Sequence, residues 1–315
     1  MKHINRFNHR HRGAALCVVM LSVAFFATSC DKSELCREDG PEALTLSSVI
    51  SPATKGINNG TTFPAGNSMV VSADLGAGTG NAGANYFSGV NFTFSTDHWQ
   101  PASGSYYWPL AGSLEILAYS SGSASVTPTW TNATNIRLVS SDFTADDVMV
   151  GGLTGATSAS RTIAFKHALA KVMFTAQASV ASTIKIKTIT VNAYKGATIN
   201  GAKSSGSSAV SFTTSSLTNQ ADISIYNSSY TCTASAASIG SAIVIPAQTP
   251  ASVTITYTIA NNGVDSPVMS VTKSLSTAMS AGSAYTLALN LTLTGLTVTA
   301  SLSDWSSGGT SSVSI

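Results

Sequence analysis

The sequence predicts an all-β protein: two antiparallel β-sandwich domains in tandem, preceded by a secretory signal peptide. Apolar and polar residues alternate in Val253–Ile259 (VTITYTI) and Tyr285–Leu293 (YTLALNLTL), which is the period of half-buried strands. Clusters of Gly, Ser and Asn separate such segments, as tight turns require. After the leader, no segment keeps a convincing helical period. These three observations favour the all-β class.

The first 29 residues have the three parts of a secretory signal peptide. MKHINRFNHRHRG is basic, Ala14–Ala27 is apolar, and small residues precede Cys30. Fourteen apolar residues are too few to span a bilayer, which takes roughly 20. The junction resembles the lipobox of bacterial lipoproteins, which implies that Cys30 is acylated (palmitate being the expected chain) and that residues 30–41 form a tether to the outer membrane. The alternative is an ordinary secreted protein with an incidental cysteine.

The mature chain is almost neutral. Residues 1–29 remove four of the 16 basic residues and none of the 14 acidic ones, which leaves 12 against 14, a net charge of −2. No basic face remains for nucleic acid. The length suits two domains, and the glycine-rich stretch Gly151–Ser160 predicts domains at 42–160 and 161–315. Charged residues make up only 10%, which suits a protein outside the cell.

Strand candidates follow one another along the predicted first domain. They are Leu44–Ile50, Ser68–Ala73, Tyr86–Ser95, Ser105–Trp108 and Leu114–Ser120. In the second domain, the segment TIKIKTITV changes phase, because Ile184 and Ile186 share one parity whereas Ile189 and Val191 share the other. A one-residue shift exchanges the two faces of a strand, so we expect a β-bulge near Thr188.

We find no catalytic, cofactor or metal motif and predict a protein that is not an enzyme. The mature chain has two histidines, His98 and His167, and we expect His167 to hydrogen-bond at a domain edge. The adjacent pair Asp146-Asp147 points to opposite faces if it lies on a strand, so it makes a poor carboxylate dyad. Cys36 and Cys232 are interpreted as free thiols, with a disulfide between them as the alternative.

Six short motifs occur in a fixed order along the chain. They are the lipobox at Cys30, Ala53-Thr54-Lys55-Gly56, Tyr106–Leu110 with Leu114–Tyr119, Ala164–Phe174, Val244–Gln248, and Ala281–Leu291 with Leu302–Trp305. In this order they resemble the fimbrillin family of Bacteroidetes, the lipoprotein subunits of type V pili. The resemblance implies transthyretin-like sandwiches and a structural, adhesive subunit at the outer membrane and, after processing, in the pilus.

The resemblance also implies assembly by strand exchange. In the family, a protease cuts after a basic residue in the loop behind the first strand, and a C-terminal strand of a neighbour fills the vacated groove. Here the cut would follow Lys55, with Arg37 as the alternative, and the donor would lie within Tyr285–Ile315. The displaced strand would hold Leu44, Leu46, Val49 and Ile50, and the donor face would be Tyr285, Leu287, Leu289, Leu291 and Leu293.

Other pilin subunits are therefore the expected partners, together with host or bacterial surface receptors. The alternative function is a glycan-binding surface lipoprotein without polymerisation, with Tyr106, Tyr107 and Trp108 as sugar platforms. On a strand, however, Tyr106 and Trp108 share one face and Tyr107 takes the other. We expect Trp108 and Trp305 to fill cores, and Lys171 to point to solvent or pair with a carboxylate.

Overall fold

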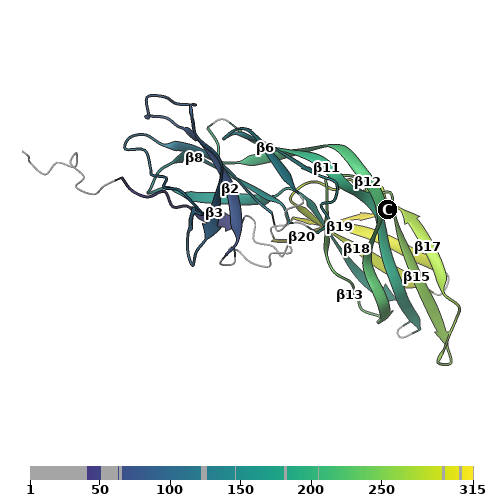
Figure 1. The fold of residues 1–315 in the computed structure, drawn as a ribbon. Helices are drawn as coiled ribbons and strands as arrows, with labels where there is room; N and C mark the ends of the chain where they lie inside the picture. Colours follow the sequence, from purple (N-terminus) through teal and green to yellow (C-terminus); the bar gives the residue numbers. More distant parts are fainter. Residues whose placement is uncertain are drawn as a thin grey trace, which may run out of the picture. The chain divides into compact units, whose positions relative to one another are not determined.

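The computed structural model consists of strands, turns and loops throughout the part of the chain that it describes (Figure 1). Its described residues are 41–50, 63, 66–121, 126–145, 147–180, 183–204, 206–292, 295–304 and 307–314, with side chains to residue 292. The all-β class is confirmed. In these ranges no helix is long and apolar enough to cross a membrane.

The first sheet has seven strands and places the first strand at one edge. In spatial order they are β1 (Ser47–Ile50), β9 (Thr162–His167), β8 (Met149–Ala156), β5 (Leu114–Ser120), β2 (Ser68–Leu75), β3 (Asn85–Phe94) and β4 (Trp99–Pro101). Neighbours are antiparallel except β1 and β9, which run parallel. The chain between them is long, and only a long crossover can join parallel neighbours.

Two further sheets complete the fold. One contains β13 (Ala237–Ser238), β10 (Ala170–Ala178), β18 (Ser283–Thr292), β19 (Gly295–Asp304) and β20 (Ser307–Ser314), with β14 (Ile243–Ile245) on β10. The other contains β16 (Val264–Asp265), β15 (Ser252–Asn261), β11 (Ile184–Lys203), β7 (Asn135–Ser140) and β6 (Thr127–Asn132), with β12 (Val210–Thr231) on β11 and β17 (Met269–Ser274) on β15.

The long hairpin β11–β12 serves both halves of the chain. On its other side, β11 pairs with β15 over Ile184–Asn192 and with β7 over Ala197–Ala202. Strand β9, which follows residue 160, hydrogen-bonds within the first sheet. Residues 43–315 form one compact unit by contact, so the division into domains at 160/161 stays a prediction.

The predicted bulge in β11 is confirmed. The ladders of β11 with β12 and with β15 both shift register between Ile186 and Thr188. As a result, Ile184, Ile186, Ile189 and Val191 are all fully buried in one core although their sequence parity changes.

The described residues form three apolar cores. The first sheet buries one face in an aromatic core that includes Phe92 and Trp99. Its other face packs on β6, β7 and the second half of β11, as shown by the cluster of Leu117, Leu138 and Ile199. The third core fills the space between β10–β18 and β11–β15.

Most predicted strands are present with ends shifted by at most a few residues, and Leu114–Ser120 is matched at both ends. Ser105–Trp108 is the exception, because Tyr107 forms only an isolated bridge to Ala43. Pro109 follows directly and has no N–H to continue a ladder. This segment is therefore a loop between β4 and β5.

Candidate functional site

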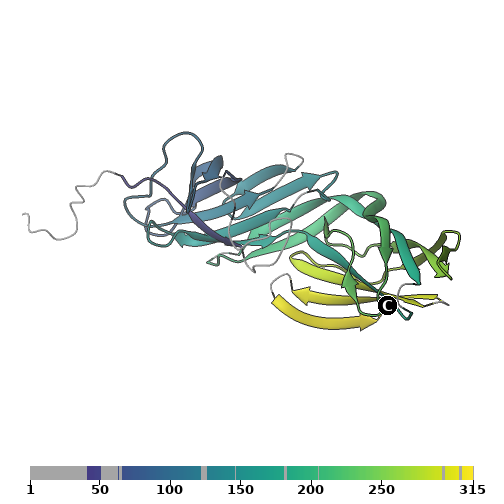
Figure 2. The same ribbon diagram turned by 90° about the horizontal axis from the view of Figure 1, so that it is seen from below.

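Residues 43–50 close a gap between the two edges of the first sheet (purple in Figure 2). On one side, Leu46 and Trp99 of β4 exchange two backbone hydrogen bonds of 3.0 and 2.7 Å. On the other side, Ser47–Ile50 runs parallel to β9. The first segment thus pairs with both edge strands, and its removal would leave both edges unpaired along a shared slot.

The segment lines this slot with alternate side chains. Leu44, Leu46 and Ile50 are buried in the aromatic core, with at most 4% of their surface exposed. Val49 also lies in the strand but points outward and is 45% exposed. Three of the four residues predicted for a displaced strand therefore fill a core, in the alternation that a β-strand provides.

Rings form the floor of the slot. Trp99 is fully buried, and its ring centroid lies 5.0 Å from that of Phe63 and 5.0 Å from that of Phe94. Phe63 also packs edge-on against Phe165 of β9. Large rings in edge-to-face contact make a rigid, apolar receiving surface.

Three side-chain hydrogen bonds fix the segment in register. They join Arg161 Nη1 to Thr45 Oγ1 (2.6 Å), Ser47 Oγ to Thr162 Oγ1 (2.7 Å), and Trp99 Nε1 to Ser48 Oγ (2.8 Å). Sequence reasoning did not single out Trp99 or Arg161. Neither lies in an alternating segment, and their role depends on partners about 50 and 116 positions away.

The residues proposed for processing, Cys30, Arg37 and Lys55, lie outside the described residues, as does Leu293 of the proposed donor. The rest of the donor face is described. Tyr285, Leu287, Leu289 and Leu291 are all buried in the third core.

These donor residues stand in the middle of a sheet. Strand β18 pairs in parallel with β10 and antiparallel with β19, so both of its edges are occupied. Strand β20 pairs with β19 and lies at the end of the sheet order. Release of β18 would break two ladders, whereas release of β20 would break one.

A comparison with protein families identifies the chain. The fimbrillin-like family matches residues 54–305, which is most of the sequence. This chain belongs to the fimbrillin-like family. No curated protein sequence gives a significant match.

Solved structures show that this fimbrillin-like chain shares its fold with two proteins of Bacteroides. A proposed cell adhesion protein of Bacteroides uniformis ATCC 8492 is 17% identical, with a TM-score of 0.55 over 86% of this chain and 100% of that one. A fimbrial protein of Bacteroides vulgatus ATCC 8482 is 14% identical, with a TM-score of 0.55 over 83% and 99%. At 17% and 14% sequence identity, these comparisons show a shared fold.

The fimbrillin-like motif Val244–Gln248 has a structural role. The side-chain amide of Gln248 accepts a hydrogen bond from the backbone N–H of Tyr194 and donates one to its carbonyl, both at 2.7 Å. Gln248 thus imitates one residue of a β-ladder and ties the loop after β14 to β11.

The three aromatic residues considered for glycan binding do not share an exposed face. Trp108 is 6% exposed and belongs to the aromatic core, which agrees with the expected core role. Tyr106 packs against the same core, and Tyr107 is 39% exposed. A sugar platform needs adjacent exposed rings, and this loop presents one.

Lys203 is a buried lysine of this fimbrillin-like chain that is paired within the fold. Lys203 of β11 reaches Glu115 of β5, and Lys203 Nζ also donates to Thr154 Oγ1 at 3.1 Å. Burial raises the pKa of Glu115, but the hydrogen bond and charge of Lys203 outweigh it, so that the pKa lies below its usual value. Lys171, for which solvent exposure was one expectation, is only 6% exposed.

The hydrogen bond that was expected of His167 is present. Its Nδ1 lies 2.7 Å from Asp147 Oδ1, and both side chains are about 1% exposed. Asp146, the other half of the adjacent acidic pair, lies outside the described residues.

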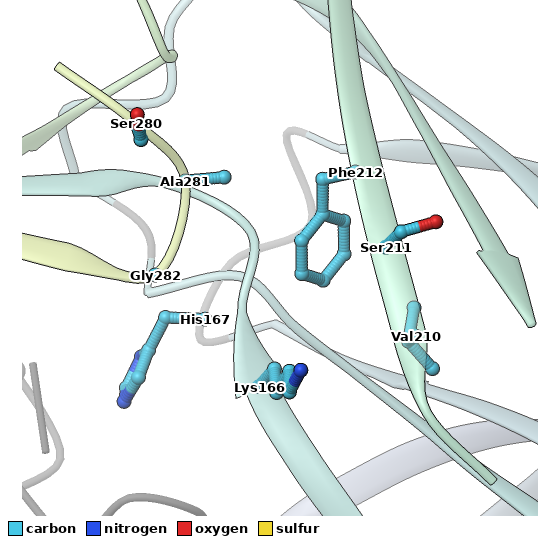
Figure 3. A pocket seen from close by; sticks show the side chains of 8 residues that line it. All are labelled: Lys166, His167, Val210, Ser211, Phe212, Ser280, Ala281 and Gly282. Atoms are coloured by element: carbon cyan, nitrogen blue, oxygen red, sulfur yellow. The ribbon is translucent and has the colours of Figure 1, made fainter.

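A cleft of about 390 Å³ lies beside His167 (Figure 3). Phe212 of β12 and Ala281 of the loop before β18 face it, whereas the ring of His167 points away from Phe212. Among described side chains, no three His, Cys, Asp or Glu residues lie close enough to hold a metal ion. Cys232 is a buried free thiol, and burial raises its pKa to about 11, so it is a poor nucleophile.

Proposed function

We propose that this chain is the precursor of a pilus or adhesin subunit that assembles by strand exchange. Acylation of Cys30 would anchor it in the outer membrane, and cleavage at Lys55 would free the segment that contains residues 43–50. Membership of the fimbrillin-like family supports the surface role. The protein would act as a structural and adhesive subunit and not as an enzyme.

The slot described above carries this proposal. Residues 43–50 are held by a four-residue ladder with β9, by backbone hydrogen bonds to Trp99, Tyr106 and Arg161, and by three side-chain hydrogen bonds. Both β4 and β9 keep another neighbour in the sheet, so the segment can leave without unravelling another strand. Each buried aliphatic side chain contributes about 1.5–3 kcal/mol, or about 5–9 kcal/mol for the three in this segment. Whole domains are stable by only about 5–15 kcal/mol, so an empty slot strongly favours a replacement strand.

Limited proteolysis tests this assembly step. The folded full chain is treated with a lysine-specific protease, and the products are followed by size and by ladders on gels without heating. We expect polymers after cleavage at Lys55 and monomers from a Lys55→Gln chain. Cleaved chains that release the fragment ending at Lys55 and remain monomeric would contradict strand exchange. Polymers made only by an arginine-specific protease that cuts at Arg37 would contradict release of the first segment, because that cut leaves residues 43–50 attached to the chain.

The anchor is tested separately by mass spectrometry of the membrane fraction. We expect acyl chains on Cys30 and a soluble product from a Cys30→Ser chain. An unmodified Cys30 in membrane-bound protein would contradict the anchor.

A further inference from the structure

We infer that strand β12 binds an extended peptide of a partner protein, which adds to the free edge of the strand and places an acidic side chain in the cleft beside Phe212. This cleft shares no lining residue with the slot of residues 43–50. The inference therefore stands apart from the strand exchange proposed above.

Strand β12 has one unpaired edge among the described strands, because it pairs with β11 alone. The peptide groups of β11 show which residues form this edge. The N–H of Lys203 donates to the carbonyl of Thr134, so the main-chain groups of Lys203 face β7 and those of Ala202 face β12. The register partner of Ala202 is Ser211, so Ser211 and every second residue from it face β11. The free edge therefore consists of the N–H and C=O groups of Val210, Phe212 and Thr214.

The side chains of the same three residues line a groove under this edge. Val210 and Phe212 line the cleft of about 390 Å³, and Phe212 and Thr214 line a second hollow of about 370 Å³. The two hollows share Phe212, Ser280 and Ala281, and together they are called the β12 groove. The ring of Phe212 points from β12 toward the loop that holds Ala281 (Figure 3).

An extended peptide supplies what both parts of this surface lack. In an antiparallel pairing, the peptide residue opposite Phe212 exchanges two hydrogen bonds with it and sends its side chain to the same face, into the groove. The peptide residues two positions before and after it do the same opposite Thr214 and Val210. Alternating N–H and C=O groups along an edge match a peptide main chain, which a sugar does not provide.

The groove is positively charged at the Val210 end. Lys166 lines it there and is exposed. The other ionisable residue at this end, His167, contacts Asp147 and turns its ring away from Phe212. Among the described lining residues of both hollows there is no carboxylate. Charge complementarity therefore favours Glu or Asp in the peptide opposite Val210.

Thr214 adds a polar position at the other end of the groove. Its Oγ1 is buried and has no hydrogen-bond partner among the described residues. Buried polar groups are nearly always hydrogen-bonded, so a hydroxyl group on the peptide residue opposite Thr214 is favoured. The inward side chains of the peptide are then a hydroxyl group, an aliphatic group opposite Phe212 and a carboxylate opposite Val210.

Peptide binding to the uncut Lys55→Gln chain tests the inference. The probe is the labelled, end-capped peptide Ser-Thr-Ser-Val-Ser-Glu-Ser, whose Thr, Val and Glu side chains face inward. We expect saturable binding. Methylation of the valine main-chain nitrogen should weaken binding about tenfold, because that N–H bonds the edge of β12. Methylation of the next serine nitrogen, which faces solvent, should change the affinity by at most about twofold.

A charge exchange tests the acidic position. Lys166→Glu should weaken binding of this probe about threefold and strengthen binding of the same peptide with Lys in place of Glu by a similar factor. Lys273→Glu is the control, because it makes the same change of charge at an exposed position of β17 outside the groove. It should leave the ratio of the two affinities unchanged.

Three results would overturn the inference. They are no saturable binding, an equal loss from the two methylated peptides, and the same change of ratio in both lysine variants. A dimer of the uncut chain that fails to bind the probe would also overturn it if Thr214→Pro gives monomers, because that change removes only an N–H of the free edge and would assign the edge to a second copy. Since the chain is uncut, each of these results leaves strand exchange untouched.

Discussion

Residues 43–50 and strand β18 both send alternate leucines into a core, but they are attached very differently. Strand β18 lies between β10 and β19 and is hydrogen-bonded along both edges. The first segment has a four-residue strand beside β9 and two isolated bridges, from Leu46 to Trp99 of β4 and from Ala43 to Tyr107. The same hydrophobic pattern therefore belongs to an internal strand with long ladders on both sides in one place and to a short closing strand in the other.

The core around β18 and the core under residues 43–50 also differ in the kinds of residue that fill them. The core around β18 consists mainly of aliphatic residues. The core under residues 43–50 is richer in rings and contains Phe63, Phe92 and Trp99. Ring pairs contribute about 0.5–1.5 kcal/mol each beyond their buried area, so the first core depends more on contacts between rings and the second on contacts between aliphatic strands.

The largest effect is expected in the fixed strand. Leu289→Ala should lower the free energy of unfolding by about 2–5 kcal/mol, because it leaves a cavity under a strand that cannot move. Chemical denaturation measures this loss. Val49→Ala, at an outward position, is the control and should change stability by at most about 0.5 kcal/mol.

The matching change in the removable segment should act locally. Leu46→Ala removes an equally buried side chain and should destabilise the segment by about 2–3 kcal/mol. Hydrogen exchange should then speed up at residues 43–50 while β10 and β18 keep their protection. A uniform loss of protection over all three would remove the distinction between the two regions.

Acid should lower the free energy of unfolding through protonation of Glu115. The pKa of Glu115 is lowered in the folded state, so its contribution is present above the ordinary value of 4.5 and is lost as the pH falls through the lower folded value. Unfolding measured from pH 7 to pH 3 should show stability falling below about pH 4.5. Glu115→Gln should make this fall in stability shallower. If the variant shows the same dependence of stability on pH as the original chain, the carboxylate of Glu115 is not its cause.

The smallest effect is expected at the polar anchor of the segment. Arg161→Ala removes the 2.6 Å hydrogen bond to Thr45 at a half-buried position and should destabilise residues 43–50 by about 0.5–1 kcal/mol. Hydrogen exchange of the segment measures it. Lys166→Ala, at an exposed position further along β9, should leave the exchange rates unchanged.

Some features of the fold could be predicted from the sequence and others could not. The parity change between Ile186 and Ile189 predicted a real bulge, since a strand must keep its apolar groups on the buried face. The parallel pairs β1–β9 and β10–β18 could not be predicted, because alternation is the same in either direction. The loop at Ser105–Trp108 was predicted as a strand because aromatic residues favour strands, and the effect of Pro109 was missed.

The slot was predicted in part. The alternation of Leu44, Leu46 and Ile50 indicated a strand with one buried face, and the burial of all three confirms that face. The contacts of Trp99 and Arg161 were not predictable, because they join groups far apart along the chain. Arg37 and Lys55 remain predictions.

The sequence alone determined the all-β class, the periodic faces of the strands and the motifs that indicate the family, because these depend on local order and spacing. Tertiary structure alone decided which alternating segment is internal and which closes a gap between two edges. Whether a strand lies at the edge of a sheet depends on which strands pair with it. Folding brings those partners together from distant parts of the chain.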